Sequence, residues 1–295
     1  HYIDAPGGTG KTMLLNYLKC FVELQRNEES AVRLTAMTGI ASTLLIKGQT
    51  FHSLWKCPFV QRGAFALNLS SEHAKKLKRT SMFVVDEATM MHKWQLEALS
   101  ETMKQLCASD SPFGGKTVIL AGDWRQCLPV VPKASPAEVV ENTILRSPLW
   151  RSFEISNLSE NFRCPTPWFA EHALAVGNGE DLPIRPVEYL NAQVVSGLPH
   201  HCLQLKVGMP LMLSRTPFRW FRRQFPIRTS YAITCQKAQG QALQAVGIDL
   251  TANPFFTHGQ AYVSISRTTD PAKLFVAGHF KNIVWEDVLA LASNN

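Results

Sequence analysis

Short apolar runs alternate with helical stretches along the first half of the chain. The runs at 82–85 and 117–121 are apolar without a polar alternation, and 13–24 places its leucines and aromatic residues at helical spacing. Strands that are apolar on both faces and alternate with helices are typical of a parallel sheet covered by helices. We therefore predict an α/β fold with parallel strands at 2–4, 32–35, 82–85 and 117–121.

The pattern becomes less regular near Asn157, where we place a domain boundary. A helix is predicted at 168–176, and Gly177-Asn178-Gly179 and a proline-rich link follow it. A chain of 295 residues is long enough for two cores. We expect a first domain at 1–157 and a leaner second domain at 158–295. Short strands of the second domain are predicted at 203–207, 211–214, 246–250 and 261–265.

Composition narrows the class of protein. With 45% apolar and 18% charged residues the chain is typical of a globular protein, and no apolar run reaches the roughly 18 residues of a membrane span. The net charge of +7 fits a polyanion such as nucleic acid about as well as a merely basic surface. Seven cysteines without a Cys-x-x-Cys pair argue against a zinc ribbon or a disulfide framework and favour an intracellular protein. Because the chain begins at His1 in a predicted strand, we interpret it as a fragment.

The clearest functional pattern is a glycine-rich loop between a predicted strand and a predicted helix. It runs from Ala5 to Thr12, and alanine stands where such loops usually begin with glycine. Glycines allow backbone N–H groups to surround phosphates, and the helix N-terminus adds a favourable field. Lys11 is predicted to contact the β- and γ-phosphates, and the Thr12 hydroxyl to ligate Mg²⁺. The nucleotide-binding residues are therefore Gly7, Gly8, Thr9, Gly10, Lys11 and Thr12.

Two further strands end in polar residues. Asp86 and Glu87 follow the run at 82–85, which suits a Mg²⁺ ligand and a residue that polarises the attacking water. Asp123, Arg125 and Gln126 follow 117–121, at the edge where open α/β sheets bind ligands. Gln126 is a candidate for sensing the γ-phosphate. Each of these two motifs alone is weak evidence for a nucleotide site. Together with the phosphate loop, they are strong evidence.

Taken in order, these strings resemble the Pif-one family of superfamily-one DNA helicases, most closely the version that Helitron transposons encode. The resemblance covers nearly the whole chain. The matching strings lie at 3–12, 38–42, 51–53, 86–88, 121–126, 158–163, 203–210, 222–226, 236–241, 247–250 and 262–267.

The resemblance implies two RecA-like domains, with ATP and Mg²⁺ in the cleft between them. It implies movement 5′ to 3′ along single-stranded DNA, in repair, recombination, telomere maintenance or transposition. We expect a nuclear protein, with the mitochondrion as the alternative. By motif position, Arg163 and Arg267 would reach the γ-phosphate from the second domain and join Glu87 and Gln126 as catalytic residues. DNA contacts are expected from Thr38, Ser42, Phe51, His52, Lys237, Gln239 and Gly240.

Three parts of the family pattern are missing. They are the segment before the phosphate loop, a strand-helix unit after Gly179, and a small β-barrel subdomain between Thr216 and Pro217. The basic and aromatic residues at 215–228 are interpreted as a strand in preference to a DNA-binding surface. These departures place unwinding in doubt more than nucleotide binding. Two alternatives stay open: a degenerate helicase remnant without turnover, and another P-loop enzyme such as a nucleotide kinase.

Overall fold

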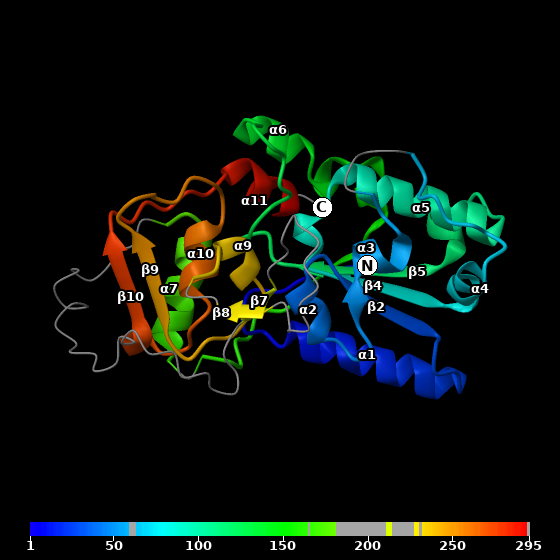
Figure 1. The fold of residues 1–295 in the computed structure, drawn as a ribbon, viewed down its shortest axis with the longest axis horizontal. Helices are drawn as coiled ribbons and strands as arrows, with labels where there is room; N and C mark the ends of the chain where they lie inside the picture. Colours follow the sequence, from blue (N-terminus) through cyan, green and yellow to red (C-terminus); the bar gives the residue numbers. More distant parts are fainter. Residues whose placement is uncertain (59–62, 165, 181–210, 214–226, 230–231, 294–295) are drawn as a thin grey trace, which may run out of the picture.

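A six-stranded parallel sheet forms the centre of the first half of the protein (Figure 1). The computed structural model describes residues 1–58, 63–164, 166–180, 211–213, 227–229 and 232–293. The strand order is β3-β2-β4-β5-β1-β6, so β1 lies inside the sheet. The strands are β1 (Tyr2–Asp4), β2 (Val32–Ala36), β3 (Gln49–Thr50), β4 (Met82–Asp86), β5 (Thr117–Gly122) and β6 (Ile155–Asn157).

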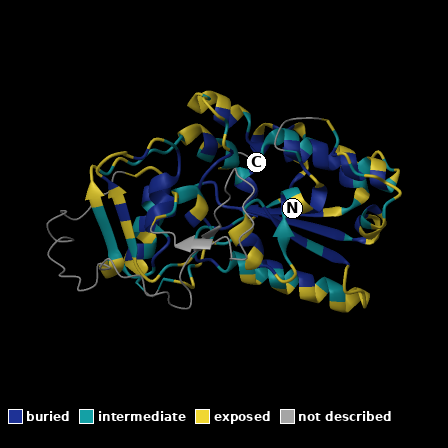
Figure 2. Cartoon of the chain, in the orientation of Figure 1, coloured by how far each residue is buried: buried dark blue, intermediate teal, exposed yellow. Residues whose placement is uncertain are grey.

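Helices cover both faces of this sheet, which explains why its strands are apolar throughout. All five residues of β4 are buried, and its four apolar residues alternate between two cores. Val84 packs with Leu15 of α1 (Lys11–Arg26), on the face that α2 (Gly39–Thr43) also covers. Phe83 packs on the opposite face with Leu99 of α5 (Lys93–Cys107). That face is completed by α3 (Phe51–Trp55) and α4 (Glu72–Arg79), and the central strands are the buried layer in Figure 2.

The second half forms a smaller unit beside the carboxyl ends of the strands (Figure 1). Its parallel strands β9 (Val246–Leu250) and β10 (Leu274–Gly278) pack with α7 (Pro167–Gly177) and α10 (Gln260–Ile265) around a separate core. The described part also contains an antiparallel pair, β7 (Leu211–Leu213) and β8 (Ile227–Thr229). The described residues also form the α-helices α6 (Pro136–Glu141), α9 (Cys235–Ala238) and α11 (Glu286–Ser293).

Most of the predicted elements are confirmed. The four predicted strands of the first half are β1, β2, β4 and β5, and the predicted helices are α1 and α7. The prediction of a strand at 261–265 was wrong, because α10 occupies these residues. Each residue from Gln260 to Ile265 is buried, so no alternation separates a strand from a helix there. Of the other predictions, 246–250 is β9 and 211–213 is β7, while 203–207 lies outside the described residues.

The described residues show no membrane-spanning helix, no three-residue metal-binding group and no disulfide. Among the helices of the described residues, none is long and apolar enough to cross a membrane. Within the same residues, no three His, Cys, Asp or Glu side chains form a group that could hold a metal ion by themselves. The six cysteines of the described ranges are free thiols.

Candidate nucleotide site

The glycine-rich loop joins β1 to α1 in a conformation that needs its glycines. Gly8 and Gly10 have φ of 96° and 81°, in the region that favours glycine. A β-carbon on Gly8 would lie 2.5 Å from Oδ1 of Asn161, so the space is closed as well. The Thr9 hydroxyl donates to the Pro6 carbonyl at 2.8 Å. The loop is therefore held in shape before any phosphate binds.

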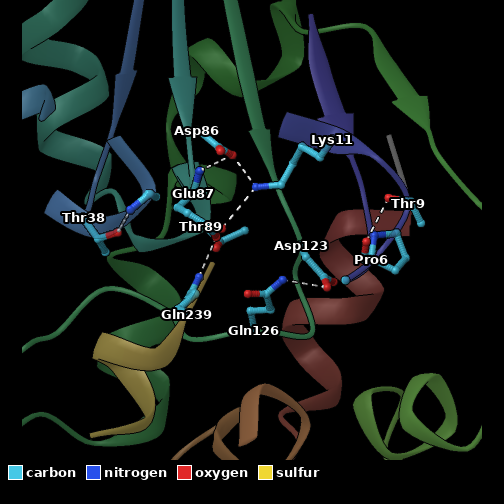
Figure 3. Close-up of polar contacts among 12 residues, drawn as sticks. Pro6, Thr9, Lys11, Thr38, Asp86, Glu87, Thr89, Asp123, Gln126 and Gln239 are labelled. Atoms are coloured by element: carbon cyan, nitrogen blue, oxygen red, sulfur yellow. Dashed lines mark hydrogen bonds and ion pairs between the residues drawn. The ribbon is translucent and has the colours of Figure 1, made fainter. Parts of the chain in front are cut away.

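Lys11, at the start of α1, points to the carboxylates of Asp86, the last residue of β4, and of Glu87, which follows it (Figure 3). Its Nζ donates to Oδ1 of Asp86, and to Oε1 of Glu87 at 3.2 Å. Burial raises the pKa of the Asp86 carboxyl. Burial acts in the same direction on Glu87, but the charge of Lys11 and the Gln239 amide outweigh it and lower the pKa of that carboxyl. The carboxylates thus hold the lysine side chain beside the glycine-rich loop.

A cavity of about 90 Å³ opens between the phosphate loop and these carboxylates. Predicted site residues from distant parts of the chain line this cavity together. The lining includes Gly7, Gly8, Gly10, Lys11, Thr12, Asp86, Glu87, Gln126, Arg163, Gly240 and Arg267.

The loop after β5 forms a polar network beside this cavity. The Gln126 amide donates to Oδ2 of Asp123 at 3.0 Å (Figure 3). This hydrogen bond holds the uncharged Gln126 side chain in the lining of the cavity. Arg125 contacts the other oxygen of Asp123 at 3.2 Å and Oδ2 of Asp4 at 3.4 Å. Arg125 also donates to Oδ1 of Asn178 at 2.8 Å, so this loop is tied to the second half.

The two predicted arginines differ in exposure. Arg163 is exposed and lines the cavity from the segment after β6. Arg267 is only 2% exposed, and it donates to the carbonyl oxygens of Val263 and Gln241 at 2.8 and 3.1 Å. Burial lowers the pKa of Arg267 from its usual high value, and the charge of Glu87 opposes this. Both arginines are brought to the cavity, with Arg267 fixed in place by its own unit.

Three residues of the site were given no such role by the sequence. The Tyr262 hydroxyl, on α10, accepts from the Gly7 N–H at 3.0 Å, and the Asn161 amide donates to the Gly7 carbonyl at 3.0 Å. Gln239, which follows α9, donates to Oε2 of Glu87 at 2.7 Å (Figure 3). All three join the second half to the glycine-rich loop or to Glu87, which follows β4. The only sequence signal was their position inside the matching strings.

The predicted DNA contacts are placed in different environments. Phe51 is fully buried, and its ring packs 5.9 Å from that of Phe65, so its aromatic face is used in the core. Gln239 is likewise 0% exposed and faces Glu87, which separates it from a DNA surface. Ser42 is buried, and the Thr38 side chain caps α2 by accepting from the Ala41 N–H.

The remaining three predicted DNA contacts are more accessible. His52 is half-buried, with Nε2 3.3 Å from the Gln95 amide nitrogen. Lys237 is exposed on α9, and Gly240 is half-buried beside the cavity. The accessible charge of this set therefore belongs to Lys237.

Comparison with known proteins decides the family. A family model described as PIF1-like helicase matches residues 1–179, which hold the phosphate loop, both carboxylates and Arg163. The chain belongs to the PIF1-like helicase family. A second model, described as the 2B domain of the DNA helicase Pif1, matches residues 188–216.

Relatives of the family are longer than this chain. The chain is 30% identical to the ATP-dependent DNA helicase Pif1 of a Psychrobacter species over 197 residues, which are 64% of the chain and 27% of that protein. It is 32% identical to the ATP-dependent DNA helicase PIF1 of Candida albicans over 138 residues, 45% of the chain and 15% of that protein. The chain thus spans about a quarter, or less, of the length of these curated relatives.

Solved structures of the family share the fold. The structure of Pif1 helicase from Bacteroides in complex with ADP-AlF3 and single-stranded DNA has a TM-score of 0.71 at 19% identity, over 98% of this chain and 91% of that one. The Candida albicans Pif1 helicase has a TM-score of 0.70 at 21% identity, over 99% and 94%. The likeness confirms the predicted α/β architecture of RecA-like helicases.

Two of the three predicted gaps, after Gly179 and after Thr216, fall near residues that the structure does not describe. The 2B-domain match ends at Thr216, the residue at which we expect the β-barrel insertion to be missing. Of the matched stretch 188–216, the structure describes Leu211–Leu213 alone. The basic and aromatic stretch at 215–228 lies outside the described residues except for its end in β8. The missing insertion stays a prediction.

Proposed function

We propose that the chain is an ATP-dependent DNA helicase or translocase, moving 5′ to 3′ on single-stranded DNA. The observation that carries this is the cavity in which the phosphate loop, Asp86, Glu87 and Gln126 meet Arg163 and Arg267 from the second half. A cation, two carboxylates and two arginines around a phosphate loop are the groups that phosphoryl transfer from a nucleoside triphosphate needs. We divide the protein into an ATP-binding unit, 1–157, and a second unit, 158–295.

The side chains present fit a divalent cation. The Thr12 hydroxyl and the Asp86 carboxylate line the same cavity, and hydroxyl and carboxylate oxygens are ligands that Mg²⁺ prefers. Both would hold Mg²⁺, which neutralises charge on the β- and γ-phosphates when bound. In this structure the Lys11 ammonium group binds the carboxylates of Asp86 and Glu87. It would leave them and bind the phosphates when ATP is present.

Hydrolysis uses Glu87 as the group that accepts a proton from water. The water oxygen attacks the γ-phosphorus, the bond to the bridging oxygen breaks, and ADP and phosphate leave. Gln126 orients the γ-phosphate or the water, while Arg163 and Arg267 stabilise the charge that develops on the transferred group. Because the arginines come from the second unit, turnover depends on contact between the units.

Single-stranded DNA is the proposed partner. The family membership and the net charge of +7 support it, together with the exposed Lys237 on α9. The two predicted internal gaps, after Gly179 and after Thr216, would weaken unwinding more than hydrolysis, since strand separation needs a second contact with DNA as well as turnover. We propose action on nuclear or mitochondrial DNA, in repair, recombination, telomere maintenance or transposition.

Phosphate release tests this function. We expect the 295-residue chain to hydrolyse Mg-ATP and to be stimulated by an oligothymidine strand, with DNA affinity falling steeply as salt rises. Hydrolysis that DNA does not stimulate would contradict the helicase assignment. Absence of turnover would indicate a non-catalytic remnant, and phosphate transfer to a nucleoside monophosphate would indicate a kinase.

A further inference from the structure

His258 is a buried histidine whose two ring nitrogens both have backbone partners. The residue is 1% exposed. The Trp285 N–H donates to Nδ1 at 2.9 Å, and Nε2 lies 2.8 Å from the Trp124 carbonyl oxygen. Because a backbone N–H can only donate and a carbonyl can only accept, Nδ1 is the acceptor and Nε2 carries the proton. The two partners therefore specify one neutral tautomer, and burial favours the neutral ring further by lowering the pKa of His258.

This histidine joins three segments that are far apart in the sequence. Trp124 belongs to the loop after β5 and is buried in the core of the first unit. His258 itself directly precedes Gly259, the N-cap of α10. Trp285 directly precedes α11, and Val288 of that helix is fully buried in the same core of the first unit (Figure 1). The helix α11 thus returns from the second unit to the first, and His258 lies where the three segments meet.

The loop after β5 is also in close backbone contact with the start of α10. A β-carbon on Gly259, whose φ is 76°, would lie 2.6 Å from the Gln126 carbonyl oxygen and 2.7 Å from that of Arg125. The space for a side chain is therefore closed, and this φ itself favours glycine. The Gly259 N–H donates to the Ile283 carbonyl at 3.2 Å, which ties the start of α10 to the segment before α11. A shift of the loop toward α10 thus requires a shift of α10 as well.

Two groups of the nucleotide cavity are attached to the segments that His258 joins. Gln126 follows Trp124 by two residues, and Arg267 follows the end of α10. We propose that His258 is a positioning residue, which sets the Gln126 side chain relative to Arg267 through the hydrogen bond from Nε2 to the Trp124 carbonyl. This inference rests on the proposed ATPase function. His258 is not among the described residues that line the nucleotide cavity, so it acts on turnover through Trp124.

Two substitutions separate the two hydrogen bonds of the ring. The amide nitrogen of glutamine can take the place of Nε2, so His258→Gln keeps a donor for the Trp124 carbonyl and loses the acceptor for the Trp285 N–H. The side-chain oxygen of asparagine can take the place of Nδ1, so His258→Asn keeps the acceptor and loses the donor. Because each variant lacks one hydrogen bond, a merely structural role predicts the same loss of turnover in both.

The positioning role predicts that the two variants differ. We expect ATP turnover in His258→Asn to fall about tenfold, near the upper limit for the loss of one neutral hydrogen bond, and turnover in His258→Gln to stay near that of wild type. Mg-ATP affinity should be unchanged in both, because Lys11 and the glycine-rich loop are left intact. Phosphate release measures turnover and calorimetric titration measures affinity. His279→Asn, on an exposed histidine, is the matched control and should behave as wild type.

A spectroscopic signature tests the tautomer of His258 independently of turnover. A long-range proton–nitrogen correlation spectrum of the histidine rings, compared with that of His258→Gln, identifies the His258 signals. The wild-type ring should be neutral, with its proton on Nε2. A charged ring, or a neutral ring with its proton on Nδ1, would overturn the inference. Thermal unfolding verifies that the variants fold.

The remaining outcomes separate this inference from the proposed function. Equal turnover in His258→Asn and His258→Gln would overturn the inference, and so would weakened Mg-ATP binding in His258→Asn. If His258→Asn fails to fold, reduced turnover in a folded His258→Gln would overturn it instead. In each case hydrolysis by the wild-type chain leaves the proposed function standing. If the wild-type chain fails to hydrolyse ATP, the proposed function falls, and this inference falls with it.

Discussion

The two units of the protein hold their functional side chains in different ways. Asp86 and Glu87 come at the end of β4, a strand buried at all five positions within a six-stranded sheet. Gln239 follows α9, which has four residues, and Arg267 follows α10, which has six. The first unit therefore positions its functional side chains through a continuous core. The second unit positions its functional side chains through short helices that contact the first unit.

Contacts across the boundary show what this difference means. The Tyr262 hydroxyl accepts from the Gly7 N–H, and Gln239 donates to Glu87, so the second unit contacts the glycine-rich loop and the residue that follows β4. The Lys11 contacts, in contrast, lie within the first unit. We infer that the first unit binds the nucleotide. The second unit controls when that nucleotide is hydrolysed. Three substitutions test this division.

The largest effect is expected from Glu87→Gln. The amide keeps the shape of the side chain but cannot accept the proton from water, so turnover should fall about 10²-fold or more. Mg-ATP affinity should change little, because the phosphates are held by the loop and by Lys11. Phosphate release and calorimetric titration measure the two quantities. Weakened binding with unchanged turnover would place Glu87 among the phosphate-binding groups.

A smaller effect is expected from Tyr262→Phe, which removes the hydroxyl and keeps the ring. The lost hydrogen bond from Gly7 should reduce the free energy of unfolding by about 0.5–1.5 kcal/mol, measured by urea denaturation. The matched control is Tyr17→Phe, since Tyr17 is 63% exposed on α1. Equal stability of the two variants would show that the contact between Tyr262 and Gly7 does not hold the units together.

The sequence predicted the parts of the site that are local. A glycine loop between a strand and a helix, and carboxylates at the end of an apolar run, can be recognised within about ten residues of chain, so Lys11, Asp86 and Glu87 were found. The contacts from Gln239 to Glu87 and from Tyr262 to Gly7 join residues 152 and 255 positions apart. No local pattern specifies such a pair, because it depends on how the two units meet.

The burial of the predicted DNA contacts could not be read from the sequence for a related reason. A matching string identifies residues near a function, but it does not say which side chain is buried. The Phe51 ring, expected among the DNA contacts, packs against Phe65 in the core, and a contact of this segment with DNA stays a prediction. The helix at α10 was missed because its residues are all buried, and an apolar run without alternation fits a strand equally well.

Calorimetric titration of Mg-ATP into wild type and Lys11→Ala tests most directly whether the first unit binds the phosphates. Removing one charge-assisted contact, worth roughly 1.5–3 kcal/mol, should weaken binding about tenfold or more. Lys47→Ala is the control, because the Lys47 side chain is 70% exposed and pairs with Glu29 on the surface. The account predicts weaker binding in Lys11→Ala and normal binding in Lys47→Ala. Equal ATP affinity in wild type and Lys11→Ala would contradict it.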